Sequence, residues 1–131
     1  MRIIAFAETT PALLAGAKTV TRREWKHSYA RTFSAGEVLQ AWDKNPRTKQ
    51  GRRVATIRLT AAPEWQRARD VPPEDYAAEG FAYLDAHGLT LGPVAGTTRR
   101  STPGEVWDSW LTAPPEFGLW VVRFELVAVL P

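Results

Sequence analysis

The chain has 131 residues, the length of one typical domain, so we expect a single domain, 1–131, with one hydrophobic core. Hydrophobic residues make up 44% and charged residues 24%, which argues against a disordered chain, and no apolar run approaches the roughly 20 residues of a membrane span. The absence of cysteine excludes disulfides and thiolate zinc sites, and only two histidines are present, so we expect no metal and no cofactor.

The basic residues are unevenly distributed along the chain. Of the net charge of +3, the segment 18–53 contributes +7, with ten lysines and arginines against three acids, and the rest contributes −4. Basic residues gathered in one part of a fold attract phosphates, so the segment predicts a face that binds nucleic acid, with a merely solvated face as the alternative. Because the N-terminus lacks a secretion signal, we expect a cytoplasmic protein without membrane contact.

The first half of the chain predicts a strand, a short helix and three further extended segments. The run 2–7 is typical of an opening strand. Thr9 or Thr10 can cap a helix with Pro11 in its first turn, and Gly16 can end it in the left-handed conformation. The extended segments are 19–23, 38–42 and 53–61, and an exposed polar hairpin loop, 43–51, joins the last two.

The second half predicts a charged connector, two helices separated by a loop, and a closing strand. Asp70 can cap a helix that continues to about Ala86, and a loop covers 89–100. Thr102 and Glu105 have the spacing of a capping box, which predicts a second helix ending at Trp110 or Leu111. The strand 119–129 closes the chain. This order is α+β, and so few short strands are best buried by curling into a small β-barrel with helices packed at its openings.

The octapeptide 16–23, GAKTVTRR, has the composition of an anion-binding pocket. It combines a helix-ending glycine, a lysine, two hydroxyls and two guanidinium groups. Lys18 and Thr21 are an odd number of positions apart, so on a regular strand their side chains would diverge. They converge only if Lys18 lies in the turn before the strand or at a bulge; the alternative interpretation is an exposed turn with polar side chains.

The same octapeptide resembles the G-x-K-T-x-T-x-R signature of the ASCH family, a group of small barrels with a PUA-like fold. The resemblance extends in chain order to the strands 38–42 and 53–61, to Glu79-Gly80-Phe81 and to the final strand, WVVRFELV. The hairpin 43–51, the loop 89–100 and Trp25 lie outside the general pattern. The resemblance implies a PUA-like barrel with a cleft between barrel and helices that faces RNA or a nucleotide.

The resemblance also implies a set of three site residues. In small ASCH proteins that resemble amidohydrolases acting on N4-acetylcytidine, the catalytic positions match Lys18, Thr21 and Glu79. A lysine desolvated in a pocket can have a pKa low enough to take the proton of a threonine hydroxyl, and a glutamate can orient the lysine or move a proton to the leaving amine. The alternative for Glu79 is an ordinary exposed glutamate on a helix.

Phosphates and bases would be bound beside this set. The candidate nucleic-acid-binding residues are Arg22, Arg23, Trp25, Lys26, Arg47, Lys49, Arg52 and Arg53. Four functions remain open: recognition of RNA or a modified nucleoside, deacetylation of N4-acetylcytidine, cleavage of RNA in the same cleft, and an accessory interaction domain with a vestigial pocket. The identity of the ligand and the oligomeric state are not contained in these patterns.

Overall fold

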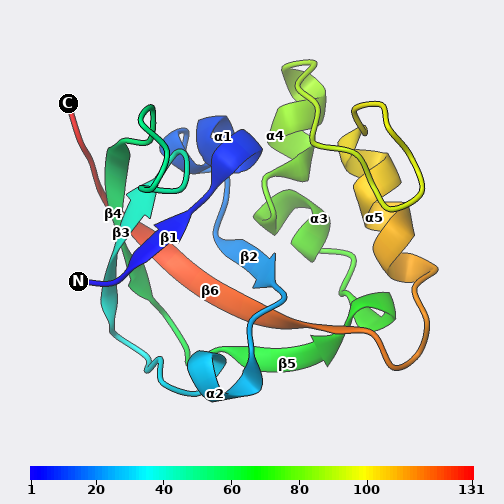
Figure 1. Cartoon of the computed structure of the whole chain (residues 1–131), viewed down its shortest axis with the longest axis horizontal. Helices are drawn as coiled ribbons and strands as arrows, with labels where there is room; N and C mark the ends of the chain where they lie inside the picture. The colour runs from blue at the N-terminus through cyan, green and yellow to red at the C-terminus, as the bar shows by residue number, and fades with distance from the viewer.

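A six-stranded mixed sheet curls around the main hydrophobic core in the computed structural model, which describes residues 1–131 (Figure 1). The strands are β1 (Ile3–Ala5), β2 (Val20–Arg23), β3 (Val38–Trp42), β4 (Arg53–Leu59), β5 (Glu64–Arg67) and β6 (Gly118–Val129). Their order is β1-β3-β4-β6-β2, and β5 also pairs with β6. Only β1 and β3 are parallel. The α+β class and the curled sheet with helices packed against it confirm the prediction.

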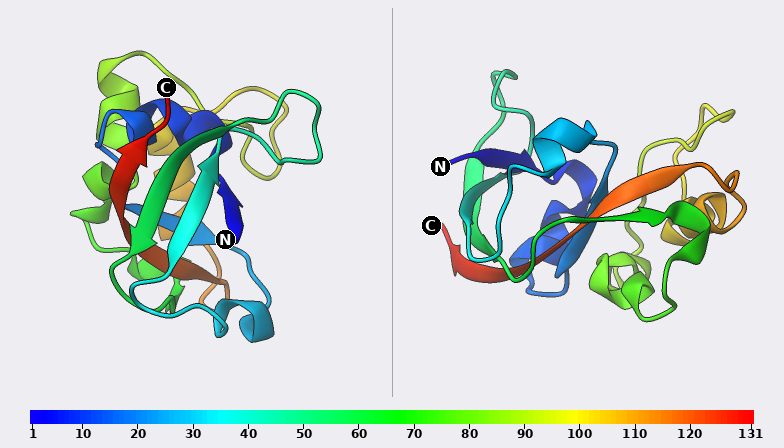
Figure 2. Two further views of the ribbon diagram at one scale, coloured as in Figure 1. Left: turned by 90° about the vertical axis from the view of Figure 1, so that its left-hand side faces the viewer. Right: turned by 90° about the horizontal axis from the view of Figure 1, so that it is seen from below.

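The long strand β6 joins the two parts of the sheet. Its C-terminal half pairs with β4, whereas its N-terminal half pairs with β2 on one side and β5 on the other. The two views of Figure 2 show this strand crossing from the curled part of the sheet to the helices. No strand ladder joins β1 to β2, so the barrel is open along this seam.

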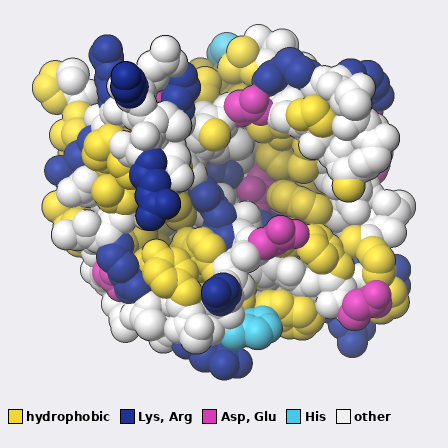
Figure 3. Space-filling model, in the orientation of Figure 1, with side chains coloured by type: hydrophobic (Ala, Val, Ile, Leu, Met, Phe, Trp, Pro, Cys, Tyr) yellow, Lys and Arg dark blue, Asp and Glu magenta, His cyan; other side chains and the backbone are white.

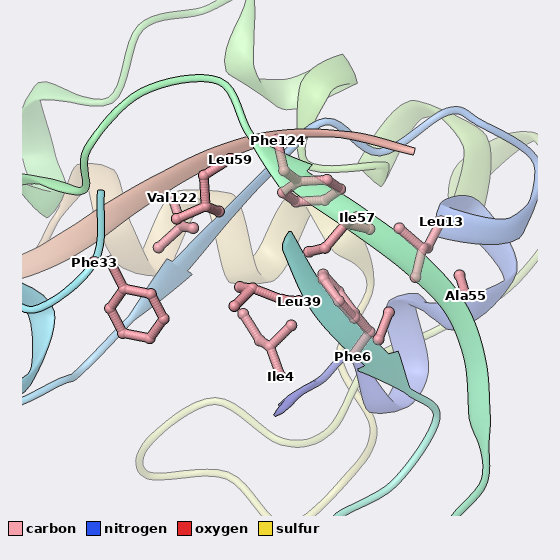
Figure 4. Packing of buried hydrophobic residues seen from close by; sticks show 11 residues of the cluster. Ile4, Phe6, Leu13, Phe33, Leu39, Ala55, Ile57, Leu59, Val122 and Phe124 are labelled. Carbon is pink, nitrogen blue, oxygen red and sulfur yellow. The ribbon is translucent and has the colours of Figure 1, made fainter. Parts of the chain in front are cut away.

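The side chains of β4 alternate between the core and the outer face of the sheet. Ala55, Ile57 and Leu59 of β4 are fully buried, and Arg58 is exposed. They pack against apolar side chains of β1, β3, β6 and α1 (Thr10–Leu14), including Leu13 (Figure 4). The regular register of β4 against β3 keeps one face of the strand inward over most of its length.

The helices cover the side of the sheet where the seam lies. They are η1 (Ala7–Thr9), α1, α2 (His27–Ala30), η2 (Ala68–Asp70), α3 (Asp75–Ala78), α4 (Phe81–Ala86) and α5 (Pro103–Leu111). A second, smaller core joins α1, α4 and α5 through Ala12, Phe81 and Leu84. The predicted capping box between Thr102 and Glu105 is present at the start of α5. None of these helices has both the length and the apolar character needed to cross a bilayer.

The single helix predicted for 70–86 is wrong. The chain forms α3 and α4 instead, separated by Gly80 with φ of +88°. A Cβ atom at Gly80 would lie 2.6 Å from Ala12 Cβ and 3.3 Å from Lys18 Cβ, so only glycine allows this close approach. The break therefore lets the end of α3 lie directly against the residues that follow α1.

Two further predictions about local structure need correction. The segment 64–67, predicted as a connector, is the strand β5, whose alternation is hidden because both of its faces carry polar or exposed side chains. The strand predicted to end at Ala61 ends at Leu59. The loop 89–100 is irregular as expected, although Leu91 forms an isolated β-bridge with Ser101.

Candidate functional site

A cleft of about 910 Å³ opens along the seam between β1 and β2 and is bounded on its other side by α5 and the loop 91–95. Figure 3 shows this hollow, with hydrophobic side chains on its walls and charged side chains in its depth. The charged residues that line it are Glu8, Lys18, Arg22, Arg23 and Glu79, which give a net charge of +1. Lys18, Thr21 and Glu79, the three residues singled out from the sequence, all line the cleft.

Lys18 enters the cleft from the turn between α1 and β2. Gly16, with φ of +73°, ends α1, and β2 begins only at Val20, so Lys18 lies before the strand, as its convergence with Thr21 requires. Its side chain is 1% exposed. The Nζ atom donates to the backbone oxygen of Glu79 at 2.8 Å and to Oε1 of the same residue at 3.2 Å.

Glu79 holds two cations with one carboxylate. It is the C-terminal cap of α3, directly before Gly80, and only 2% of the residue is exposed. Oε1 accepts from Lys18, and Oε2 accepts from Arg22 Nη1 at 2.7 Å. Because two elements supply the cations and a third supplies the carboxylate, this ion pair fixes the turn before β2 against the end of α3.

The network continues away from the cleft through Arg22. Its Nη2 atom donates to Asp75 Oδ2 at 2.6 Å and to the side-chain oxygen of Gln66 at 2.9 Å. Arg123 of β6 then donates to both oxygens of Asp75, at 3.1 and 2.9 Å. Every polar atom of these two buried carboxylates therefore meets a cation, as buried charges require.

Thr21 and Arg23 lie two positions apart on β2 and therefore project from the same face of the strand. Arg23 Nε donates to Thr21 Oγ1 at 3.2 Å, and Nη2 donates to the backbone oxygen of Ala5 at 2.7 Å, which bridges the open seam. No carboxylate lies within ion-pair distance of Arg23. Burial lowers the pKa of its guanidinium to about 10, opposed by the charge of Glu79. Arg23 is thus the cation of the cleft floor that no acid neutralises.

At Lys18 and at Asp75, burial and neighbouring charges have opposing effects on the pKa. Burial lowers the pKa of Lys18, and the neighbouring Glu79 only partly opposes this effect. Burial would raise the pKa of Asp75, but hydrogen bonds from Arg123 and Arg22 outweigh it and hold the pKa below its usual range. Lys18 is therefore more easily deprotonated than a surface lysine, whereas Asp75 stays ionised.

The three predicted site residues are not joined in a chain of proton transfer. The Thr21 hydroxyl is hydrogen-bonded to Arg23, and it makes no hydrogen bond with Lys18 or Glu79. A nucleophilic role for Thr21 would need a base to come within hydrogen-bond distance of its hydroxyl proton, because the bond from Arg23 uses only a lone pair of Oγ1. Thr21 and Arg23 provide a set of fixed donors beside the ion pairs of Lys18 and Arg22 with Glu79.

The predicted nucleic-acid-binding residues divide into buried and exposed groups. Arg22 does not belong to an exposed basic face, because its side chain is 1% exposed and paired with two carboxylates. Trp25 stacks on Phe33 at 4.7 Å between ring centroids and packs against the core, so one face of its ring is already covered. Arg53 is half-buried and donates to Thr56. The exposed candidates are Lys26, Arg47, Lys49 and Arg52.

Sequence reasoning missed the outer half of the ionic network. Asp75 was interpreted only as part of a helix start, and Arg123 as part of a closing strand. The signal that could have found them is an arginine in the apolar run 119–124 of a buried strand, because such a charge needs an acidic partner elsewhere in the chain. Trp110 of α5 packs against the second core and also lines the cleft, where its ring lies 5.7 Å from the Arg22 guanidinium carbon.

No group of three or more His, Cys, Asp or Glu side chains is arranged to hold a metal ion.

Comparison with known proteins shows a similarity of fold. No family model matches the sequence, and no curated protein matches it either. Among solved structures, the chain is similar to protein EF3133 from Enterococcus faecalis V583, described as a member of the family DUF984, with a TM-score of 0.57. The two are 21% identical, and the match covers 95% of this chain and 72% of the other.

Proposed function

We propose that this protein is an ASCH-like domain that recognises RNA or a modified nucleoside, with the nucleoside bound in the cleft along the open seam. The observation that carries the proposal is the cleft floor: Arg23 and Thr21 are held in place by backbone and side-chain contacts, above the buried pairs of Lys18 and Arg22 with Glu79. Fixed donors of this kind bind an electron-rich ligand without first losing conformational freedom.

The size and lining of the cleft agree with such a ligand. A volume of about 910 Å³ lies within the range of roughly 300–1,000 Å³ typical of small-molecule sites. Trp110 and Phe117 line it and can contact the faces of a base, while Arg23 and Thr21 can donate to its oxygen atoms or to a phosphate. Aromatic walls with a few convergent donors are the combination that a nucleoside needs.

Deacetylation of N4-acetylcytidine is the second candidate, and one observation favours it. Lys18 is a buried lysine with a lowered pKa, hydrogen-bonded to Glu79 in the cleft that Thr21 also lines. That is the residue set of the amidohydrolases that the sequence resembles. The lack of a hydrogen bond from the Thr21 hydroxyl to Lys18 or Glu79 favours recognition over turnover, because no base is placed to take its proton.

The test is to incubate the protein with N4-acetylcytidine, measuring binding by calorimetry and release of cytidine by chromatography. Recognition predicts saturable binding that Thr21→Val weakens, because the variant removes one hydroxyl without changing the shape of the side chain. Thr19→Val is the matched control, since Thr19 is exposed, two positions away and absent from the cleft lining.

Turnover that disappears in Lys18→Ala, Thr21→Val and Glu79→Gln would establish the hydrolase instead of a recognition module. Binding that is equally strong in wild type and in Thr21→Val and Arg23→Gln would contradict both candidates. An RNA oligonucleotide cleaved in the same assay would support a ribonuclease, the remaining function that the sequence leaves open for this cleft.

A further inference from the structure

A second cavity, of about 340 Å³, has a lining unlike that of the cleft. Five aromatic rings surround it: Trp25, His27, Trp65, Phe117 and Trp120. Two carboxylates, Glu24 and Glu116, complete the charged part of the lining, and no lysine or arginine takes part. Phe117 is the only residue that it shares with the cleft, so its ligand need not be that of the cleft.

The strand register builds the aromatic wall. Trp65 of β5 and Trp120 of β6 are direct cross-strand partners, so both side chains project from the same face of the sheet. A Cβ atom at Gly118 would lie 2.0 Å from Trp65 Cζ2, so only glycine at this position lets the indole lie against the β6 backbone. Trp65 is nevertheless 40% exposed, which leaves much of the ring free for a ligand.

His27 fixes the geometry between the two indoles. Trp120 Nε1 donates to His27 Nδ1 at 3.1 Å, so the neutral imidazole carries its proton on Nε2. The imidazole plane is inclined by 68° to Trp65 and by 67° to Trp120, with centroids 6.4 and 5.4 Å away. Steeply inclined rings form the walls of a box, whereas a flat base is sandwiched between parallel rings.

The carboxylates give this box a negative charge. Glu24 and Glu116 are exposed, form no ion pair and accept no side-chain hydrogen bond. The π-faces of tryptophan attract a cation, and nearby carboxylates add to this attraction without needing to donate a hydrogen bond. A compact cation with apolar methyl groups fits both properties, whereas a phosphate fits neither.

We propose that this aromatic cavity binds a ligand carrying a methylated ammonium group. The assignment follows from the exposed indole of Trp65 beside Trp25 and the buried Trp120, two carboxylates without an ion pair, and the absence of lysine and arginine from the lining. It does not rest on the proposed function of the cleft.

The test is a titration of the ¹⁵N-labelled protein with choline, monitored by the indole N–H signals and compared with sodium chloride at equal ionic strength. The expected result is saturable shifts of the Trp65 and Trp120 indole signals while that of Trp42, outside the cavity, stays fixed. The neutral isostere 3,3-dimethyl-1-butanol should bind about tenfold more weakly, because it has the same shape without the charge.

Variants separate the contributions of ring and charge. Trp65→Ala and Glu116→Gln should each weaken choline binding by about three- to tenfold, whereas Glu74→Gln, an exposed glutamate outside both cavities, should not. Thr21→Val, which removes a hydroxyl from the cleft without changing the side-chain shape, should leave choline binding unchanged, so the outcome is independent of the cleft. Equal affinity for choline and its neutral isostere, no shift of the Trp65 signal, or binding unaffected by Trp65→Ala would each overturn the proposal.

Discussion

The cations of the cleft and those of the hairpin loop 43–51 belong to the same basic segment of the sequence, 18–53, but they differ in burial and in pairing. Lys18 and Arg22 are about 1% exposed at the side chain, and each meets carboxylate and other oxygen acceptors. Arg47 and Lys49 of the loop are exposed and form no ion pair or side-chain hydrogen bond. A local count of charge therefore predicts where cations are concentrated, but not whether they face solvent.

The difference has a physical consequence. Buried charges interact strongly and are held in one geometry, so removing one member leaves the others without compensation. Exposed charges are screened by salt and keep their rotamer freedom, so they act on approaching polyanions and contribute little to stability. The cleft should therefore control both folding and ligand recognition, whereas the loop should control only the salt dependence of binding.

Removal of the Glu79 carboxylate should have the largest effect. Glu79→Ala leaves Lys18 and Arg22 buried without this partner and is expected to lower the free energy of unfolding by about 3–5 kcal/mol. Urea denaturation monitored by circular dichroism measures it. The control is Glu125→Ala, which breaks the exposed pair with Arg58 and should cost about 0–1 kcal/mol. Equal losses in the two variants would refute the contrast between buried and exposed charges.

The acid limb of the stability curve, which is the loss of unfolding free energy as pH falls, should depend on Asp75. Because the folded-state pKa of Asp75 lies below its unfolded value of about 3.9, its stabilising contribution is complete above that value and is lost as pH falls through the folded-state pKa. Asp75→Asn should cost about 2 kcal/mol at pH 7 and flatten the loss of stability below pH 4.

Urea midpoints measured from pH 7 down to pH 2 test this expectation. Part of the acid limb should remain in the variant, because a hydrogen bond from Arg2 also lowers the pKa of Glu37. An acid limb of unchanged steepness in Asp75→Asn would show that the buried network is not what titrates.

Charge reversal in the loop should have the smallest effect on stability. Arg47→Glu combined with Lys49→Glu is expected to change the free energy of unfolding by no more than about 0.5 kcal/mol. RNA affinity should fall, and the slope of its logarithm against the logarithm of salt concentration should become shallower by about one for each phosphate that the loop no longer neutralises. Filter binding at several salt concentrations measures the slope, and an unchanged slope would remove the loop from the proposed RNA surface.

Local patterns predicted the elements whose burial is one-sided. The strand β4, the capping box of α5, Gly16 at the end of α1 and the hairpin loop 43–51 can each be recognised from residue types within one short segment. Neither the strand β5 nor the break between α3 and α4 could be predicted in this way. The strand β5 depends on pairing with the distant strand β6, and the break is accompanied by close packing of Gly80 against Ala12 and Lys18.

The candidate site was predicted to a similar extent. The residues of the signature include Lys18 and Thr21, the wider resemblance adds Glu79, and the structure brings all three into one cleft. The partners Asp75 and Arg123 and the hydrogen bond from Arg23 to Ala5 join residues 18 to 53 positions apart, so no local pattern contains them. Asp75 and Arg123, which help to hold the site in place, are brought together by tertiary packing and belong to no motif.

The central claim is that the cleft, and not the exposed basic loop, is where a nucleoside binds. Amide chemical-shift mapping of the ¹⁵N-labelled protein during titration with N4-acetylcytidine and with cytidine monophosphate tests it most directly. We expect saturable shifts at Thr21, Arg23, Glu79 and Phe81, and none in 43–51 for the uncharged nucleoside. Shifts confined to the loop, or no shift in the cleft at saturating ligand, would contradict the account.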